Sequence, residues 1–170
     1  TLNKWTIRSG TTADFSIDST KFPSKTLKMT YSSGVADPKS VITADGVSVN
    51  QGIIEFDYSE DPGADSGAGP IIWYNGGGTG YFYHFYAQAH ILRWTGTWTT
   101  IVSGTNTQVP GTWMKVKVIF TSSGYMENRI NDNLASSASG LVTNLDTIGF
   151  RVGVASPGWV DNVRLRKYTS

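Results

Sequence analysis

The sequence predicts an all-β fold, an antiparallel two-sheet β-sandwich (jelly roll) formed by residues 1–170 as a single domain. Two observations carry this prediction. Apolar residues alternate with polar ones at a period of two, and clusters of turn-forming residues separate these runs. A third observation is compositional: 19 glycines and only 16% charged residues favour short strands and turns over helices laced with ion pairs.

Four runs show the alternation most clearly, and each is expected to be a strand with one buried face and one solvent-facing one. They are residues 26–31, 54–58, 114–120 and 148–154. Turn signals lie at 61–63, 75–78, 110–111, 123–124 and 157–158. The segments 59–70 and 131–140 are rich in small, polar or acidic residues and are predicted to be loops.

Charge and composition exclude several kinds of function. A net charge of +1 gives no electrostatic attraction for nucleic acid or for an anionic membrane, so neither is an expected partner. The chain has no cysteine, which excludes disulfides, thiol chemistry and thiolate metal sites. No run is long and apolar enough for a transmembrane helix. We expect an extracellular or cell-surface location, as a domain processed or excised from a secreted protein.

The stretch from residue 81 to residue 90 is the most informative about function. As one regular strand, it would place Tyr81 on a core face and His84, Tyr86, Gln88 and His90 on the other face. A sugar ring offers apolar C–H groups to an aromatic face and hydroxyls to polar groups, so a mixed aromatic and polar surface suits it. The alternative is that this face is simply the solvated side of a sheet.

Further ligand-binding candidates lie near turns or on other strands. Trp73, Trp94 and Trp98 lie beside glycine-containing turns, and Tyr74 and Tyr81 flank the glycines at 76–78. Glu55, Asp57 and Arg151 alternate with apolar residues on their own strands, so they would join the 81–90 surface if all these strands shared a sheet. The remaining tryptophans, Trp5, Trp113 and Trp159, are expected in the core.

About two thirds of the chain carries a family resemblance. The segments are GIIEFDYSE (52–60), GYFYHFYAQAHILRWTGTW (80–98), VPGTWMKVKVIF (109–120), IGFRVG (148–153) and GWVDNVRLRKY (158–168). In this order they resemble the concanavalin A-like lectin/glucanase (laminin-G-like) superfamily, and most of all its carbohydrate-binding modules. The resemblance implies a jelly roll with a sugar-binding concave face or edge loop. The superfamily also contains enzymes, receptors for proteins and structural modules.

The segment from Glu55 to Glu60 has the form ExDxxE, which resembles the catalytic strand of laminarinase-type β-glucanases. That resemblance would make Glu55 the nucleophile, Asp57 the assisting carboxylate and Glu60 the acid/base. Three observations weigh against catalysis. A regular strand puts Glu60 on the opposite face, the tryptophan and glycine expected before the motif are replaced by residues 50–54, and the chain is short for such an enzyme.

Asp161 is the candidate metal ligand, for a structural calcium ion. In a regular strand it would share a face with Trp159, Val163 and Leu165, and a buried carboxylate needs a partner. The related modules place calcium against an aspartate in a closing strand of this form, and oxygen ligands suit that ion. Asp14, Asp18 or loop carbonyls would complete the site, and the acidic loop with Glu60, Asp61 and Asp65 is a second candidate. The alternative is an aspartate that is only hydrogen-bonded.

These observations leave three hypotheses. The first is a non-catalytic domain that binds a polysaccharide or oligosaccharide through aromatic stacking and polar contacts, attached to a larger chain. The second is a structural or adhesive surface module that self-assembles through protein contacts, which the low charge and the many Ser, Thr and Gly residues also suit. The third is a glycosidase that uses Glu55 and Glu60.

Overall fold

The structure is a computed structural model that describes most of the chain. The described residues are 5–9, 11–21, 25–30, 40–44, 50–61, 69–74, 81–86, 90–105, 109, 111–141, 147–152 and 157–168. Residues 8–9, 40–43, 69–74, 81–86, 147 and 152 are described by their backbone only. Among the described residues, no helix has the length and apolar character that crossing a membrane requires.

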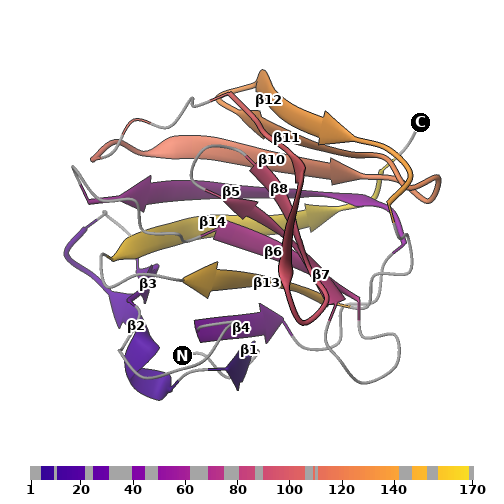
Figure 1. The fold of residues 1–170 in the computed structure, drawn as a ribbon. Helices are drawn as coiled ribbons and strands as arrows, with labels where there is room; N and C mark the ends of the chain where they lie inside the picture. The colour runs from indigo at the N-terminus through magenta and orange to yellow at the C-terminus, as the bar shows by residue number, and fades with distance from the viewer. Residues whose placement is uncertain are drawn as a thin grey trace.

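Two seven-stranded antiparallel sheets face each other, which confirms the predicted β-sandwich (Figure 1). Sheet A contains, in spatial order, β1 (Trp5–Ser9), β4 (Ser40–Ala44), β13 (Thr147–Val152), β6 (Gly69–Tyr74), β7 (Tyr81–Tyr86), β8 (His90–Trp94) and β9 (Trp98–Val102). Sheet B contains β12 (Asn133–Ala138), β11 (Met126–Ile130), β10 (Met114–Phe120), β5 (Gly52–Glu60), β14 (Gly158–Arg166), β3 (Thr26–Met29) and β2 (Phe15–Asp18). A single 3₁₀ turn, η1 (Thr12–Asp14), leads into β2.

The core lies between the sheets and is built from the predicted alternation. On β5, Ile54, Phe56 and Tyr58 are buried, whereas Glu55 and Asp57 between them are partly exposed. Phe150 of β13 meets Phe56 edge to face at 5.3 Å between ring centroids, which joins the two sheets. The residues at alternate positions of β10 are buried in the same way.

Three predicted elements differ from the structure. The segment 59–70 was expected to be a loop, but Ser59 and Glu60 belong to β5 and residues 69–70 to β6. The segment 81–90 was expected to be one strand, but it is divided between β7 and β8, which form an antiparallel pair in which Tyr86 is opposite His90. The segment 131–140 was expected to be a loop, but it contains β12. Asn131 and Asp132 make the tight turn before β12 with φ values of 50° and 65°, which asparagine and aspartate tolerate better than most residues.

A β-bulge in β14 corrects the predicted face of Asp161. Asp161 is opposite Asp57 and Arg164 is opposite Glu55, so β14 has one residue more than β5 between these pairs. Asn162 absorbs the extra residue with a φ of 53°. Asp161 therefore lies on the outer face of sheet B and does not share a face with Val163, which packs against the core.

Trp159 is buried, as expected, but on the outer face of sheet B and outside the central core cluster. It is 5% exposed, and its neighbour Val160 is the residue that joins the core. Lys21 covers the ring with its ammonium 4.1 Å from the centroid, and Asp18 accepts a hydrogen bond from the indole Nε1 at 3.0 Å. A tryptophan can thus be buried beneath charged side chains without facing the other sheet.

Candidate functional site

Four aromatic residues occupy one cross-strand row of sheet A. The register pairs Trp73 of β6 with Phe82 of β7, Phe82 with Trp94 of β8, and Trp94 with Trp98 of β9. Directly paired positions belong to the same face of a sheet. These four positions, which we call the aromatic row, therefore form a continuous line across the four strands at this end of the sheet.

The aromatic row lies on the outer face of sheet A. On β13, Ile148 and Phe150 are buried in the core, so Thr147 and Arg151 occupy positions on the opposite face. Thr147 pairs with Trp73, which extends that outer face to the aromatic row. The row and Arg151 consequently lie on the same side of the sandwich.

Trp94 and Trp98 form a close pair at the end of the β8–β9 hairpin. Their ring centroids are 5.1 Å apart with an angle of 55° between the planes, and both side chains are partly exposed. The turn between them needs Gly96, which has a φ of 95°. The hairpin thus presents two indole rings whose relative orientation is fixed by direct contact.

Arg151 contacts Trp98 on the same face of sheet A, although the two residues belong to distant strands. Its guanidinium carbon lies 4.7 Å from the centroid of the Trp98 ring, and Arg151 is only 7% exposed although it is on the outer face. Four strand steps separate β13 from β9, which would be about 19 Å in a flat sheet. Side chains cannot bridge that distance, so sheet A must curve toward its outer face and make that face concave; Figure 1 shows the β8–β9 hairpin running across the other strands.

The remaining predicted residues of sheet A fall in three groups. His84 and Tyr86 pair with Leu92 and His90, two and four positions along from the aromatic row, and so occupy the same face. Tyr74 and Tyr81 pair with each other and occupy positions on the opposite face. Gln88 lies outside the described residues.

Glu55 and Asp57 do not belong to this surface. The prediction of one polar surface required their strand to share a sheet with His84, Tyr86 and Arg151, but β5 is in the middle of sheet B. The condition for that surface is therefore not met, because sheet membership depends on long-range strand pairing, which the alternation within each strand does not encode. The two carboxylates lie on the outer face of sheet B, on the far side of the sandwich.

The three carboxylates of the ExDxxE segment are not brought together either. Glu60 is 1% exposed, and its Oε2 accepts a hydrogen bond from the buried Tyr58 hydroxyl at 3.2 Å. Glu55 is on the outer face, where Lys117 and Arg166 neutralise it at 3.7 Å and 2.8 Å. The inward position of Glu60 agrees with the period of two along the strand, and the geometry differs from a pair of carboxylates facing one sugar.

The aspartates expected beside a calcium ion at Asp161 are engaged elsewhere. Asp14 accepts a hydrogen bond from the Thr11 backbone N–H at 2.7 Å. Asp18 accepts hydrogen bonds from the Thr20 backbone N–H and the Trp159 indole N–H. The backbone N–H and the hydroxyl of Thr20, with the indole N–H of Trp159, lower the pKa of Asp18 to about 2.

Asp161 itself accepts a hydrogen bond from the Asn162 backbone N–H at 2.8 Å. In the acidic loop, Asp61 lies 3.7 Å from the ammonium of Lys21, and Asp65 is outside the described residues. Within the described part of the chain, no three or more His, Cys, Asp or Glu residues are grouped as a metal site would require. Calcium at Asp161 stays a prediction.

Of two further polar residues on β8, His90 was predicted to share a face with His84 and Tyr86, whereas Arg93 was not identified from the sequence. His90 accepts a hydrogen bond from the Gly104 backbone N–H through Nδ1 at 3.2 Å, which ties the start of β8 to the segment after β9. Arg93 alternates with Trp94 on β8 and is partly buried. Arg93 could not be placed before the β7–β8 hairpin was known.

No protein-family model and no curated protein matches the sequence. Solved structures do match. The carbohydrate-binding module CBM66 from Bacillus subtilis is 15% identical over 96% of both chains, with a TM-score of 0.67. The cellulose-induced protein Cip1 is 12% identical over 99% of this chain and 93% of that one, with a TM-score of 0.72. A β-glucanase from Bacillus licheniformis is 10% identical over 97% and 92%, with a TM-score of 0.62.

At these identities the likeness concerns the arrangement of the strands. The likeness runs along nearly the whole length of this chain and of the three structures. They include a sugar-binding module and an enzyme, so they do not distinguish binding from catalysis. The chain therefore shares the β-sandwich fold of these structures.

Proposed function

We propose that the chain is a non-catalytic carbohydrate-binding domain that holds a polysaccharide on the concave outer face of sheet A. The observation that carries the proposal is the Trp94–Trp98 pair, with Arg151 stacked against Trp98 across three intervening strands. Two fixed indole faces offer an apolar platform to the C–H groups of sugar rings, and the guanidinium adds hydrogen-bond donors beside it.

The aromatic row favours a chain of sugars over a single one. Three strand steps separate its ends, about 14 Å by the usual strand spacing. That length exceeds one sugar ring, so several rings of one polymer could lie along the row. The curvature of sheet A would bring the two sides of the polymer into contact with the protein.

The strands of sheet A favour binding over hydrolysis. Their seven segments contain no aspartate or glutamate, whereas β5 of sheet B alone contains three. Glycoside hydrolysis ordinarily requires a pair of carboxylates on either side of the scissile bond. A sheet without carboxylates in its strands suits a neutral polysaccharide that is held and not cleaved.

The likeness to a carbohydrate-binding module over nearly all of both chains supports the proposal, although it establishes the fold only. The proposal also implies a location outside the cell or at its surface, where polysaccharides are met. A structural calcium ion at Asp161 would be a separate property of sheet B, because that residue lies on the other side of the sandwich.

Affinity electrophoresis against a panel of neutral soluble polysaccharides tests the proposal, run with and without a calcium chelator. One class should retard the wild-type protein, and Trp98→Ala or Trp94→Ala should abolish the retardation. Tyr168→Ala is the matched control, because it removes an aromatic ring outside sheet A. If no polysaccharide retards the wild type, or if the control loses as much retardation as the Trp98 variant, the proposal is wrong.

A further inference from the structure

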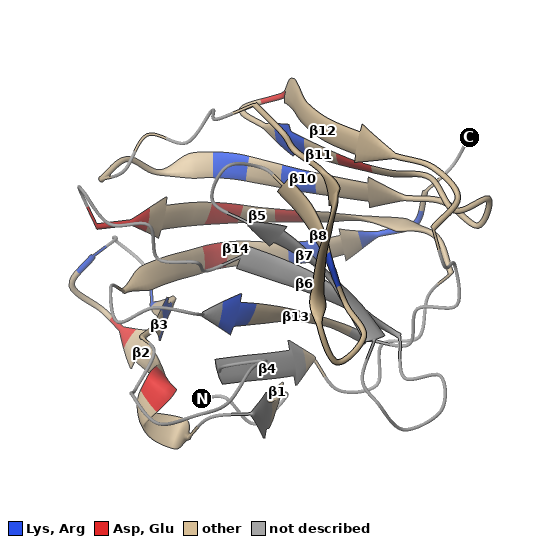
Figure 2. Cartoon of the chain, in the orientation of Figure 1, with Lys and Arg blue, Asp and Glu red and all other residues tan. Residues whose placement is uncertain are grey.

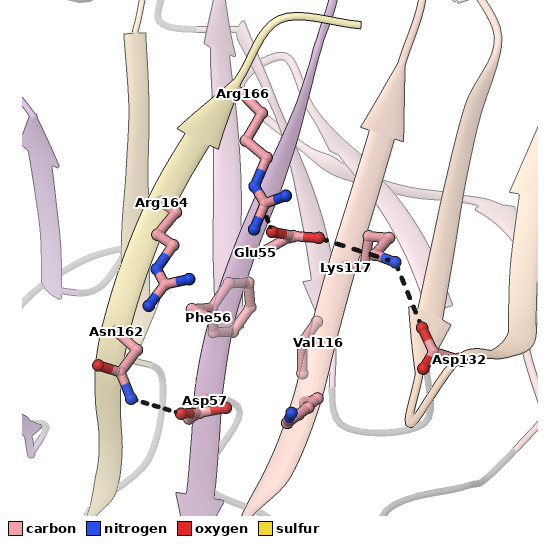
Figure 3. Close-up of a pocket in the computed structure, with 10 residues that line it drawn as sticks. Glu55, Phe56, Asp57, Val116, Lys117, Asp132, Asn162, Arg164 and Arg166 are labelled. Atoms are coloured by element: carbon pink, nitrogen blue, oxygen red, sulfur yellow. Dashed lines mark hydrogen bonds and ion pairs between the residues drawn. The ribbon is translucent and has the colours of Figure 1, made fainter.

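A second concave surface lies on the outer face of sheet B, on the side of the sandwich away from the aromatic row. It is a groove of about 370 Å³ over the central strands β10, β5 and β14, with the β11–β12 turn at one side (Figure 3). Figure 2 shows that charged residues lie side by side on these strands. We call this surface the charged groove.

Most of the charges in the charged groove neutralise one another. Glu55 accepts from Arg166 at 2.8 Å and lies 3.7 Å from Lys117, which also reaches Asp132 at 3.3 Å. Asp57 accepts a hydrogen bond from the side-chain amide of Asn162 at 2.7 Å. Each carboxylate of the groove thus has a partner from the groove itself.

Two cations of the charged groove are left over. Lys115 stands opposite Asp57 on β10 and Arg164 stands opposite Glu55 on β14, so the two flank β5. Among the described residues, neither the ammonium of Lys115 nor the guanidinium of Arg164 has an ion-pair partner within 4 Å. The groove has four basic and three acidic residues, and since the Asn162 amide is neutral, Lys115, Arg164 and Asp57 together leave one positive charge.

The backbone around the charged groove is held in unusual conformations. Among the described residues, the non-glycine positions with positive φ are Asn131, Asp132 and Asn162. Asp132 and Asn162 line the groove, and Asn131 exchanges two hydrogen bonds with the backbone of Lys115, at 2.8 Å and 3.0 Å. Such conformations cost free energy and gather at sites where side chains must be aimed.

We infer that the charged groove is a second binding site, for a sugar that carries a carboxylate, such as a uronic acid residue of an acidic oligosaccharide. The guanidinium of Arg164 and the ammonium of Lys115 would receive the sugar carboxylate, because a guanidinium fork matches a carboxylate in geometry and charge. The Asp57 oxygen that does not bind Asn162 can accept a hydroxyl proton of the same ring. The volume is at the lower end for small-ligand sites and suits one or two sugar rings.

Isothermal titration with a tri-galacturonate tests the inference. The wild type should bind it, and affinity should fall at least tenfold for Arg164→Ala and for Lys115→Ala, and only partly for Arg164→Lys, which keeps the charge but loses the fork. The fully methyl-esterified trisaccharide should not bind, because it lacks the carboxylates. Both alanine variants change exposed side chains, so circular dichroism should show an unchanged fold.

Two matched controls separate this site from general charge and from the aromatic row. Lys167→Ala removes one exposed positive charge outside the groove, and Trp98→Ala disables the proposed site of sheet A; both should bind tri-galacturonate like the wild type. The inference fails if the wild type does not bind, if Lys167→Ala weakens binding as much as Arg164→Ala, or if a sulfated trisaccharide binds as well as the carboxylate. Loss of binding in Trp98→Ala would also refute it, because the ligand would then lie on sheet A.

Discussion

The contact between Arg151 and Trp98 gives the sharpest test of the curvature of sheet A. Arg151→Met removes the guanidinium but keeps an unbranched side chain, and Trp98→Leu removes the indole but keeps an apolar residue. A double-mutant cycle with these two changes isolates the interaction between the two side chains from the other contacts that each one makes.

The expected coupling energy follows from the geometry. The separation of 4.7 Å is inside the range of about 6 Å in which a cation is attracted to a ring face. Such contacts contribute about 0.5–1 kcal/mol when exposed and about 2 kcal/mol when desolvated. Arg151 is 7% exposed and Trp98 is partly exposed, so we expect a coupling of about 1–2 kcal/mol.

Urea denaturation of the wild type, the two single variants and the double variant measures this coupling. Each single variant should lower the midpoint, and the double variant should be more stable than the sum of the two losses predicts. Arg151→Met should also weaken retardation by the polysaccharide, because Trp98 loses the group that holds it. Losses that add within about 0.3–0.5 kcal/mol would refute the contact and the concave shape inferred from it.

Gly140→Ala should lower the free energy of unfolding by about 1–2 kcal/mol, because its φ of 73° is unfavourable for alanine. Gly124→Ala, at a φ of 82°, should lower it further, because the new Cβ would also lie 2.4 Å from the Leu141 carbonyl oxygen. Equal losses of stability for the two variants in urea denaturation would contradict this. The folded-state pKa of Asp18 is about 2, below its usual 3.8, so its stabilising contribution is present above pH 4 and is lost as the pH falls through 2. Asp18→Asn should therefore flatten the fall of the urea midpoint over that range, and an unchanged acid profile would count against it. Phe150→Ala should cost about 3–5 kcal/mol of unfolding free energy, since the side chain is fully buried, and a loss under 1 kcal/mol would mean that the two sheets do not meet there.

The alternation of residues predicted the strands well where burial is one-sided. Ile54, Phe56 and Tyr58 are buried on β5 as their spacing indicates, and the positions of β10 follow the same rule. The period of two also predicted that Glu60 would face away from Glu55, because a strand without a bulge leaves no other choice.

Two features escaped prediction because they depend on single backbone conformations. The bulge at Asn162 reverses the faces of the residues that follow it in β14, and nothing in the apolar pattern of VDNVRLR marks the asparagine as left-handed. The break between β7 and β8 falls where Ala-Gln-Ala would continue a strand as readily as end one.

The candidate site was predicted only in part, because it depends on contacts between strands that are distant in the sequence. Trp94 and Trp98 were identified from their place beside a turn, and the register does bring them together with Trp73. Their partner Arg151 is 53 positions from Trp98 in the sequence, and only the strand order of sheet A and its curvature make them neighbours. Local patterns identify which residues face outward, but not which of those residues lie on the same sheet.

The strand order also has a consequence for how the chain reaches its folded state. β13 and β14 follow all the other described strands in the sequence, yet they lie inside sheets A and B, where each separates strands that are synthesised earlier. Neither sheet can complete its hydrogen bonding until residues 147–166 have left the ribosome, so the neighbouring strands keep unpaired backbone groups until then. We therefore expect this domain to complete its fold only after residues 147–166 have been synthesised, and to fold slowly because its strand pairings are long-range.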